Sequence, residues 1–159
     1  KETFDKINSN LNDTFRNLFG GGKASLILED ENDILNTGID IDVQPPGKSV
    51  KSIRLFSGGE KTLIALCVLF TIIKVKPAPL IIFDEVEAAL DQANVERFAK
   101  YVKKFEDVSQ FLIITHRPGT MAECDTLYGV TMQQRGVSQM LKVKLVDAVS
   151  MADSSEVGE

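Results

Sequence analysis

The chain has 159 residues, of which 43% are hydrophobic and 26% charged, and its formal net charge is −5. This composition indicates one globular domain and excludes a disordered chain, and the acidity argues against a strongly basic nucleic-acid surface. The longest nearly apolar run, residues 63–73, is too short for a membrane span, which needs roughly twenty residues. We therefore expect a soluble protein with no membrane partner.

The start of the chain and its cysteines suggest where the protein resides. The sequence begins at Lys1 with a polar stretch and without a signal-peptide pattern, so we expect a piece of a longer protein. The two cysteines, Cys67 and Cys124, form neither a CxxC pair nor a zinc spacing. Cys67 lies inside the apolar run and is expected to be a buried thiol, and the pair favours a reducing cytoplasm.

The first part of the chain predicts a helix followed by two strands. Apolar residues recur at three- and four-residue steps over residues 4–18, as on one face of an amphipathic helix, and the glycines at 20–22 end it. Residues 24–29 have the composition of a strand. Apolar and acidic residues alternate over 39–43, which predicts a second, half-exposed strand.

The second part of the chain predicts a strand–helix–strand unit behind a long apolar helix. Residues 57–74 form the apolar helix, and the short apolar run 80–83 is typical of a strand buried on both faces of a parallel sheet. A helical stripe over 92–105 and a second buried strand at 111–114 complete the unit. Further on we expect a short helix at 121–125, strands at 127–132 and 137–146, and a disordered tail at 148–159.

One candidate nucleotide motif is rejected. Gly22 and Lys23 resemble the end of a phosphate-binding P-loop, G-x-x-x-x-G-K-[ST]. The next residue is Ala24, which offers no hydroxyl, and the first glycine of the motif is replaced by Asn17. A strand is expected after Lys23, whereas a P-loop opens a helix. These glycines therefore serve to end the first helix and turn the chain.

Carboxylates and the only histidine follow two buried strands. Asp84 and Glu85 come directly after the strand at 80–83, and His116 follows the strand at 111–114. Since the carboxyl ends of parallel strands meet at one edge, ligands bind there. Asp84 could hold Mg²⁺ and Glu85 could act as a general base. An N-cap of the next helix explains the acidic pair about equally well.

The apolar helix opens with Ser57, Gly58, Gly59 and Glu60. Ser57 and Glu60 have the spacing of a capping box. The two glycines add a second interpretation, because a helix N-terminus without Cβ atoms presents free N–H groups to a phosphate. Both interpretations can hold together.

These segments resemble four motifs of ABC-type ATPases. Residues 55–60 (LFSGGE) resemble the signature motif, residues 80–85 (LIIFDE) the Walker B strand, and residues 89–91 (ALD) the D-loop. Thr115 and His116 resemble the switch-histidine segment. Four motifs in the right order are far more specific than any one of them.

Longer stretches are similar to the C-terminal head lobe of SMC proteins (structural maintenance of chromosomes). They cover residues 57–61, 84–95 and 110–117, while 127–138 resembles the bacterial branch. The resemblance extends over roughly residues 4–146. Three departures, Phe56, Phe83 and Glu87, remove no group that the mechanism needs. The pair Pro118-Gly119 is less usual for the family and could alter the switch loop.

The resemblance implies an α/β fold, namely an ABC-type ATPase head lobe with a largely parallel sheet flanked by helices, plus antiparallel strands. Residues 1–19 would form the foot of a returning coiled-coil helix, 20–147 the C-terminal lobe and 148–159 the tail. SMC heads are split, and the N-terminal lobe carries the P-loop. We therefore expect this chain to be inactive alone and to hydrolyse ATP only with that lobe.

The resemblance also implies a composite site for ATP and Mg²⁺ that needs two heads. The carried-over residues are Ser57, Gly58, Gly59 and Glu60 (ATP of the opposite head), Asp84 (Mg²⁺), Glu85 (attacking water), Asp91 (D-loop, dimer interface) and His116 (γ-phosphate).

The implied function is ATP-driven head dimerisation in chromosome condensation and segregation, with a nucleoid-associated location in the cytoplasm. The implied partners are the N-terminal head lobe, a second SMC head in a homodimer, the C-terminal winged-helix domain of a ScpA-type kleisin, and DNA in the full complex. Strands within 127–146 are our choice for the kleisin contact. Lys48, Lys51 and Arg54 form a basic loop, for which solvation is favoured over phosphate contacts.

Two other classes of function remain open. One is another ABC-type protein, either an SMC-related DNA-repair ATPase or a transporter subunit, although a transporter domain would carry its P-loop upstream on the same chain. The other is a non-catalytic, kleisin-binding scaffold. The presence of Ser57, Asp84, Glu85 and His116 argues against such a degenerate site.

Overall fold

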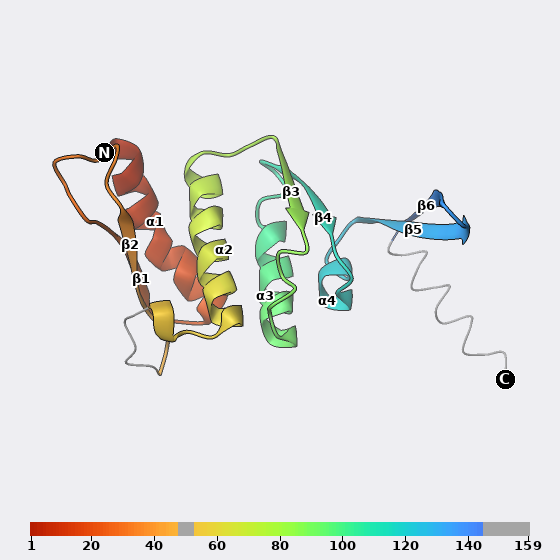
Figure 1. Ribbon diagram of the computed structural model, residues 1–159, viewed down its shortest axis with the longest axis horizontal. Coiled ribbons are helices and arrows are strands. Elements are labelled where there is room, and N and C mark those ends of the chain that lie inside the picture. The colour runs from red at the N-terminus through yellow and green to blue at the C-terminus, as the bar shows by residue number, and fades with distance from the viewer. Residues whose placement is uncertain (48–52, 145–159) are drawn as a thin grey trace. The chain divides into compact units, whose positions relative to one another are not determined.

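A computed structural model describes residues 1–47 and 53–144 of the chain. They belong to two compact units, Lys1–Thr115 and His116–Glu159 (Figure 1), and each unit is described by itself. The expected tail at 148–159 and the loop residues Lys48 and Lys51 lie outside the described residues.

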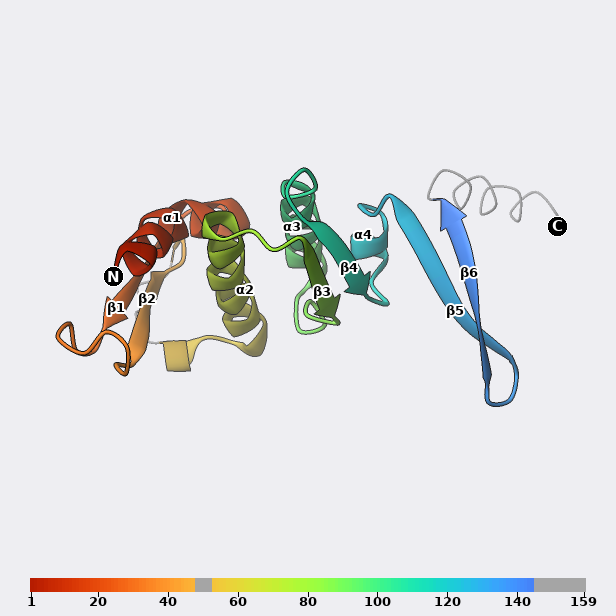
Figure 2. The same ribbon diagram turned by 90° about the horizontal axis from the view of Figure 1, so that it is seen from above.

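The first unit begins with a helix packed on a β-hairpin (Figure 2). Helix α1 (Glu2–Phe19) buries the predicted stripe and ends at Gly20, whose φ of 74° is the left-handed conformation that glycine adopts readily. Strands β1 (Lys23–Leu28) and β2 (Ile39–Gln44) pair antiparallel. A strand after Lys23 agrees with the rejection of a P-loop there.

The rest of the first unit contains the predicted strand–helix–strand arrangement. Strands β3 (Leu80–Asp84) and β4 (Gln110–Ile114) pair parallel, which confirms that prediction. Phe70 is fully buried and its ring contacts those of Phe83, Phe98, Tyr101 and Phe105. This aromatic cluster joins the long helix to the strand–helix–strand unit. The elements are η1 (Ile53–Leu55), α2 (Gly58–Val75), β3 (Leu80–Asp84), α3 (Gln92–Lys103) and β4 (Gln110–Ile114).

Cys67 lies within this core, as predicted. It is fully buried, and burial raises the pKa of its thiol well above the ordinary value. Because the thiolate is the reactive form, this cysteine is a structural residue.

The prediction that β3 is buried on both faces is wrong for one face. Phe83 and Phe111 point into the core, whereas the outer face exposes Leu80 by 52% and Ile82 by 58% of their surface. The physical reason is that only one face of the β3–β4 pair is covered within the first unit. An apolar run shows that both faces of a strand can be buried, but it does not show which elements cover them.

The second unit is a short helix followed by a long hairpin. Helix α4 (Pro118–Met121) lies N-terminal to the helix predicted at 121–125, because Pro118, with its fixed φ, occupies the first helical position. Strands β5 (Thr126–Gln134) and β6 (Val137–Lys144) pair antiparallel around Gly136, whose φ is 84°. Both strands were predicted, although β5 begins one residue earlier and ends two residues later than expected, and residues 145–146 of the second predicted strand lie outside the described residues.

The fold is α/β, as predicted, with one parallel and two antiparallel strand pairs among the described residues. The parallel part amounts to two strands, so it forms a smaller share of the sheet structure than the sequence suggested. Among the helices in the described ranges, none is both long and apolar enough to cross a membrane.

Candidate functional site

The turn before α2 is the capping box that the sequence predicted. The Ser57 Oγ accepts a hydrogen bond from the Glu60 N–H at 3.3 Å, and Glu60 Oε2 accepts one from the Ser57 N–H at 3.0 Å. The Ser57 hydroxyl also donates to Glu60 Oε2 at 3.0 Å. Ser57 and Gly58 are exposed, and a Cβ at Gly58 would meet no atom within 4 Å. Gly58 therefore leaves room for a ligand at the positive end of the helix.

Glycine is needed at position 59 because of packing, not because of the access for a phosphate that the sequence suggested. A Cβ at this position would lie 2.7 Å from the backbone oxygen of Ala89, which is closer than real Cβ atoms come. The glycine thus allows the first turn of α2 to pack directly on the turn that follows Asp84 and Glu85. The signature-like turn and the turn after β3, far apart in sequence, are thus neighbours at Ala89 within the first unit.

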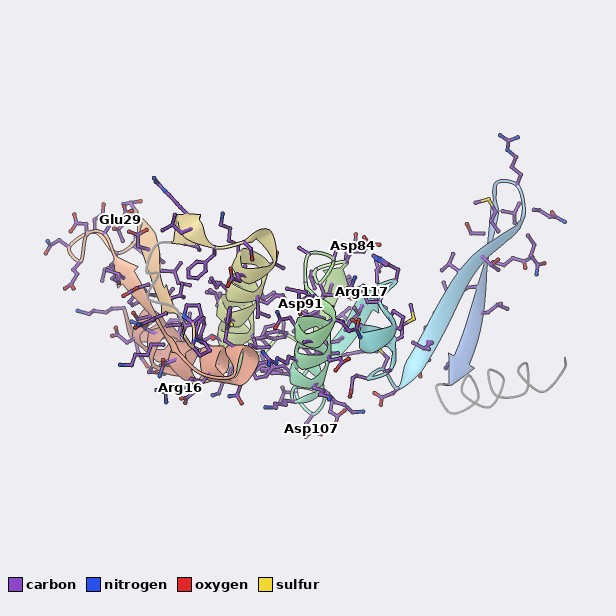
Figure 3. The ribbon with its side chains drawn as sticks, turned by 90° about the horizontal axis from the view of Figure 1, so that it is seen from below. Arg16, Glu29, Asp84, Asp91, Asp107 and Arg117 are labelled. Atoms are coloured by element: carbon purple, nitrogen blue, oxygen red, sulfur yellow. The ribbon has the colours of Figure 1, made fainter. Side chains whose placement is uncertain are left out.

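Asp84 and Glu85 lie at the carboxyl end of β3, and both are exposed (Figure 3 labels Asp84). Asp84 pairs with Ile114 of β4, and the Glu85 N–H donates to the Ile114 carbonyl at 2.9 Å. Glu85 has a φ of 47°, a left-handed conformation that is strained for a residue with a Cβ. Such strain persists only where the surroundings enforce it, and it is often found at functional positions.

The donor set at Asp84 fits a magnesium ion bound with phosphates rather than one held by protein alone. A carboxylate oxygen is the ligand that Mg²⁺ prefers, and the ion commonly takes only one or two carboxylates beside substrate phosphates and water. In the part of the chain that the structure describes, no three His, Cys, Asp or Glu side chains gather closely enough to hold a metal.

Asp91 has a structural role at the start of α3 (Figure 3). Its side chain accepts a hydrogen bond from the Asn94 N–H at 2.8 Å, and Asn94 Nδ2 donates to its second oxygen at 3.1 Å. Asp91 is therefore the N-cap of this helix, and it is also exposed.

His116 is the first residue of the second unit and is exposed. The other predicted site residues, namely Ser57, Gly58, Gly59, Glu60, Asp84, Glu85 and Asp91, lie in the first unit. The predicted site therefore comprises seven residues of the first unit and a histidine that starts the second.

The sequence reading missed two features. Glu87 was noted only as a departure, yet it is fully buried and accepts a hydrogen bond from the Thr115 hydroxyl. No local sequence pattern predicts this hydrogen bond, since the two residues are 28 positions apart. A second partial P-loop match, Gly47-Lys48-Ser49, was also overlooked; position 42 is an aspartate within β2 instead of glycine, so the full motif does not occur there either.

Comparison with known proteins agrees with these motifs. A family model described as RecF/RecN/SMC N terminal domain matches residues 5–139. The chromosome partition protein Smc of Bacillus subtilis is 56% identical over 144 residues, which are 91% of this chain and 12% of that protein. The chain belongs to the SMC family, in its bacterial branch, and spans about one eighth of the length of the curated relative that it matches.

Solved structures of SMC heads resemble the chain closely. One, from work on ATP-driven dimerisation and DNA-stimulated activation of SMC ATPases, has a TM-score of 0.83 at 41% identity and covers 98% of this chain and 94% of its own. Another, an Smc head bound to the C-terminal winged-helix domain of ScpA, has a TM-score of 0.84 at 44% identity, with 94% of this chain and 45% of that chain covered. The fold is that of part of an SMC ATPase head.

Proposed function

We propose that this chain is the C-terminal lobe of an SMC ATPase head and supplies half of a composite ATP site. One observation supports half of a head, and a second supports the choice of lobe. The chain corresponds to 45% of one head structure, and its signature-like segment precedes its Walker B-like strand without a complete P-loop in the 159 residues. The description of the matching family model speaks of an N-terminal domain, so the assignment rests on the motifs of this chain.

The observation that carries the proposal is the contact of Gly59 with the Ala89 carbonyl. It keeps the capped, exposed start of α2 beside the turn that carries Glu85, on one unit of the protein. A lobe that presents a phosphate-binding turn to one nucleotide and a carboxylate to another needs these two segments held together. A scaffold without catalysis would have no need of the strained backbone at Glu85.

The chemistry proposed is hydrolysis of the γ-phosphate of ATP. Glu85 accepts a proton from the attacking water. The oxygen of that water bonds to the γ-phosphorus, and the bond between the γ-phosphorus and the ADP oxygen breaks. Asp84 would hold Mg²⁺, and the ion would supply positive charge that neutralises the phosphates. His116 donates a hydrogen bond to the γ-phosphate of the same head. Ser57, Gly58 and Gly59 bind the γ-phosphate of ATP held by a second head, with Glu60 fixing the turn.

The proposed partners follow from this role. The N-terminal lobe completes the head, and a second SMC head docks through the signature turn and Asp91. Exposed apolar residues of the second hairpin, such as Tyr128, Val130 and Met140, offer a surface for the winged-helix domain of a ScpA-type kleisin. In the complete protein the head acts on DNA in chromosome condensation and segregation at the nucleoid.

The test is ATP hydrolysis by the chain with and without the N-terminal lobe. We expect no turnover by the chain alone, and turnover once the two lobes are mixed or joined, because the P-loop lysine comes from the other lobe. Turnover by the 159-residue chain alone would contradict the lobe assignment.

Two variants of the joined head separate the proposed roles. Glu85→Gln should bind ATP and accumulate as a dimer in size-exclusion chromatography, because the water is no longer activated. Ser57→Arg should remain monomeric with ATP, because a large side chain blocks the opposite γ-phosphate. A Glu85→Gln head that turns over ATP at the normal rate would remove Glu85 from its role.

A further inference from the structure

Glu87 is unusual because its carboxyl group is buried. It is 0% exposed, and within the described ranges it is the only buried residue with an ionisable carboxyl group. Burying such a group is costly unless hydrogen bonds compensate it. The residue lies two positions after Glu85 and four before Asp91, so whatever holds Glu87 also holds the segment between those two residues.

One partner of Glu87 is the last residue of the first unit. Thr115 Oγ1 donates a hydrogen bond to Glu87 Oε1. Thr115 follows β4 directly, and the residue before it, Ile114, accepts the hydrogen bond from the Glu85 N–H. Two consecutive residues at the end of β4 therefore tie the turn after β3 to the sheet, one through the backbone and one through side chains.

The same turn is held from a second direction and within itself. The Ala89 carbonyl packs on Gly59 at the start of α2. Inside the turn, the Ala88 N–H donates to the Glu85 carbonyl at 3.0 Å and the Leu90 N–H to the Glu87 carbonyl at 2.9 Å. Glu87 is thus at the centre of a turn that touches β4 on one side and α2 on the other.

We propose that Glu87 is a positioning residue for ATP hydrolysis, acting through its bond to Thr115. The bond fixes the turn so that Glu85 keeps its strained backbone and Asp91 keeps its place at the start of α3. Because Gly59 packs on the same turn, the position of Glu85 is also fixed relative to the signature turn. This inference rests on the proposed function, since it assigns Glu87 a task in the same reaction.

The experiment compares Thr115→Val with Thr115→Ser in the full-length protein that contains this chain. Valine keeps the shape of threonine without the hydroxyl, whereas serine keeps the hydroxyl that bonds Glu87. We expect Thr115→Val to lower kcat for ATP about tenfold or more with KM nearly unchanged, because a small misplacement of a reacting group slows chemistry without weakening binding. Thr115→Ser should restore most of kcat.

A second readout does not depend on hydrolysis. Hydrogen–deuterium exchange of a peptide covering residues 85–91 should be several-fold faster in Thr115→Val than in wild type, and close to wild type in Thr115→Ser. If exchange rises throughout the head, Thr115→Val is globally destabilised. The same measurements are then made on Glu87→Gln instead. Glu87→Gln keeps the volume and one acceptor oxygen, and it should show the same two changes to a smaller degree.

The outcomes separate this inference from the proposed function. A wild-type protein that does not hydrolyse ATP contradicts the proposed function, and the exchange measurement then still decides whether the bond orders the turn. A folded Thr115→Val variant with wild-type exchange over 85–91 overturns the inference. So does a variant whose turn exchanges faster while kcat stays at the wild-type value.

Discussion

The two faces of the β3–β4 sheet are built from the same kind of residue but have opposite surroundings. On the inner face, Phe83 and Phe111 join the aromatic cluster around Phe70. On the outer face, Ile82 and Leu112 lie side by side and about half of each side chain is exposed. Purely parallel sheets are covered on both faces in stable proteins, and within the first unit only the inner face of this strand pair is covered.

The largest effect is expected on the inner face. Phe70→Ala should lower the free energy of unfolding by about 3–5 kcal/mol, because it removes a fully buried ring and leaves a cavity among four other rings. Denaturant unfolding of the 159-residue chain followed by circular dichroism measures the change. Leu112→Ala on the outer face is the matched control and should cost less than about 1 kcal/mol, because that side chain is already half exposed. Equal losses would show that the faces do not differ.

The next effect concerns the outer face and association. Ile82→Lys should leave the unfolding free energy of the chain within about 0.5 kcal/mol of wild type, because the side chain is exposed. The same change should weaken binding to the N-terminal head lobe at least about tenfold, since an unpaired charge would be buried in the contact. Isothermal titration calorimetry with that lobe provides the measurement. Unchanged affinity would mean that the lobe does not cover this face.

The contrast between the two sheet faces also shows which features of the fold can be predicted from the sequence. The inner and outer residues of β3 alternate within one apolar run, so the run predicts the strand but cannot tell which face has its cover in the same chain. Residues 57–74 were predicted as a helix that begins with a capping box, and α2 has both features, because a cap and its helix are local in sequence. The short helix was predicted too far toward the C-terminus, because Pro118 begins the helix and the apolar pattern used for the prediction is weak.

In the candidate site, too, local features could be predicted from the sequence and long-range contacts could not. Asp84, Glu85 and Ser57 were found because each stands next to an element with a clear local signal. The contact between Gly59 and Ala89 and the bond between Thr115 and Glu87 were not found, because both join segments about thirty residues apart. Local patterns therefore predicted which groups could act, and tertiary packing decides how they are held.

A third surface, the outer edge of β1, is completed within the chain. Asn8 Nδ2 donates to the Leu26 carbonyl at 3.0 Å and Asn8 Oδ1 accepts from the Leu26 N–H at 2.8 Å, so α1 takes the place of a neighbouring strand. Asn8→Ala should destabilise the chain by about 1 kcal/mol, because both backbone groups lose their partner. Asn10→Ala is the control, since Asn10 bonds only within its helix and gains the same helix propensity. If the two variants unfold alike, the amide contributes nothing at this edge.

The smallest effect at neutral pH is expected within the inner aromatic cluster. Tyr101 donates a hydrogen bond from its hydroxyl to Thr14 Oγ1 at 3.3 Å, and its ring packs on Phe70 and Phe105. Tyr101→Phe keeps the ring and removes the hydroxyl, so it should cost about 0.5–1 kcal/mol at pH 7.

Alkaline pH should narrow the stability difference between wild type and Tyr101→Phe. Burial raises the pKa of Tyr101 in the folded chain, so the folded state resists losing this proton while the unfolded state loses it near pH 10. Wild-type stability should therefore fall as the pH rises above about 10, and the Phe variant lacks that loss. The other tyrosine and Cys67 are the same in both proteins, so the difference between their unfolding free energies isolates Tyr101. A gap that stays constant from pH 7 to pH 11 would show that the Tyr101 hydroxyl is open to solvent and that the inner face is less tightly closed than its rings suggest.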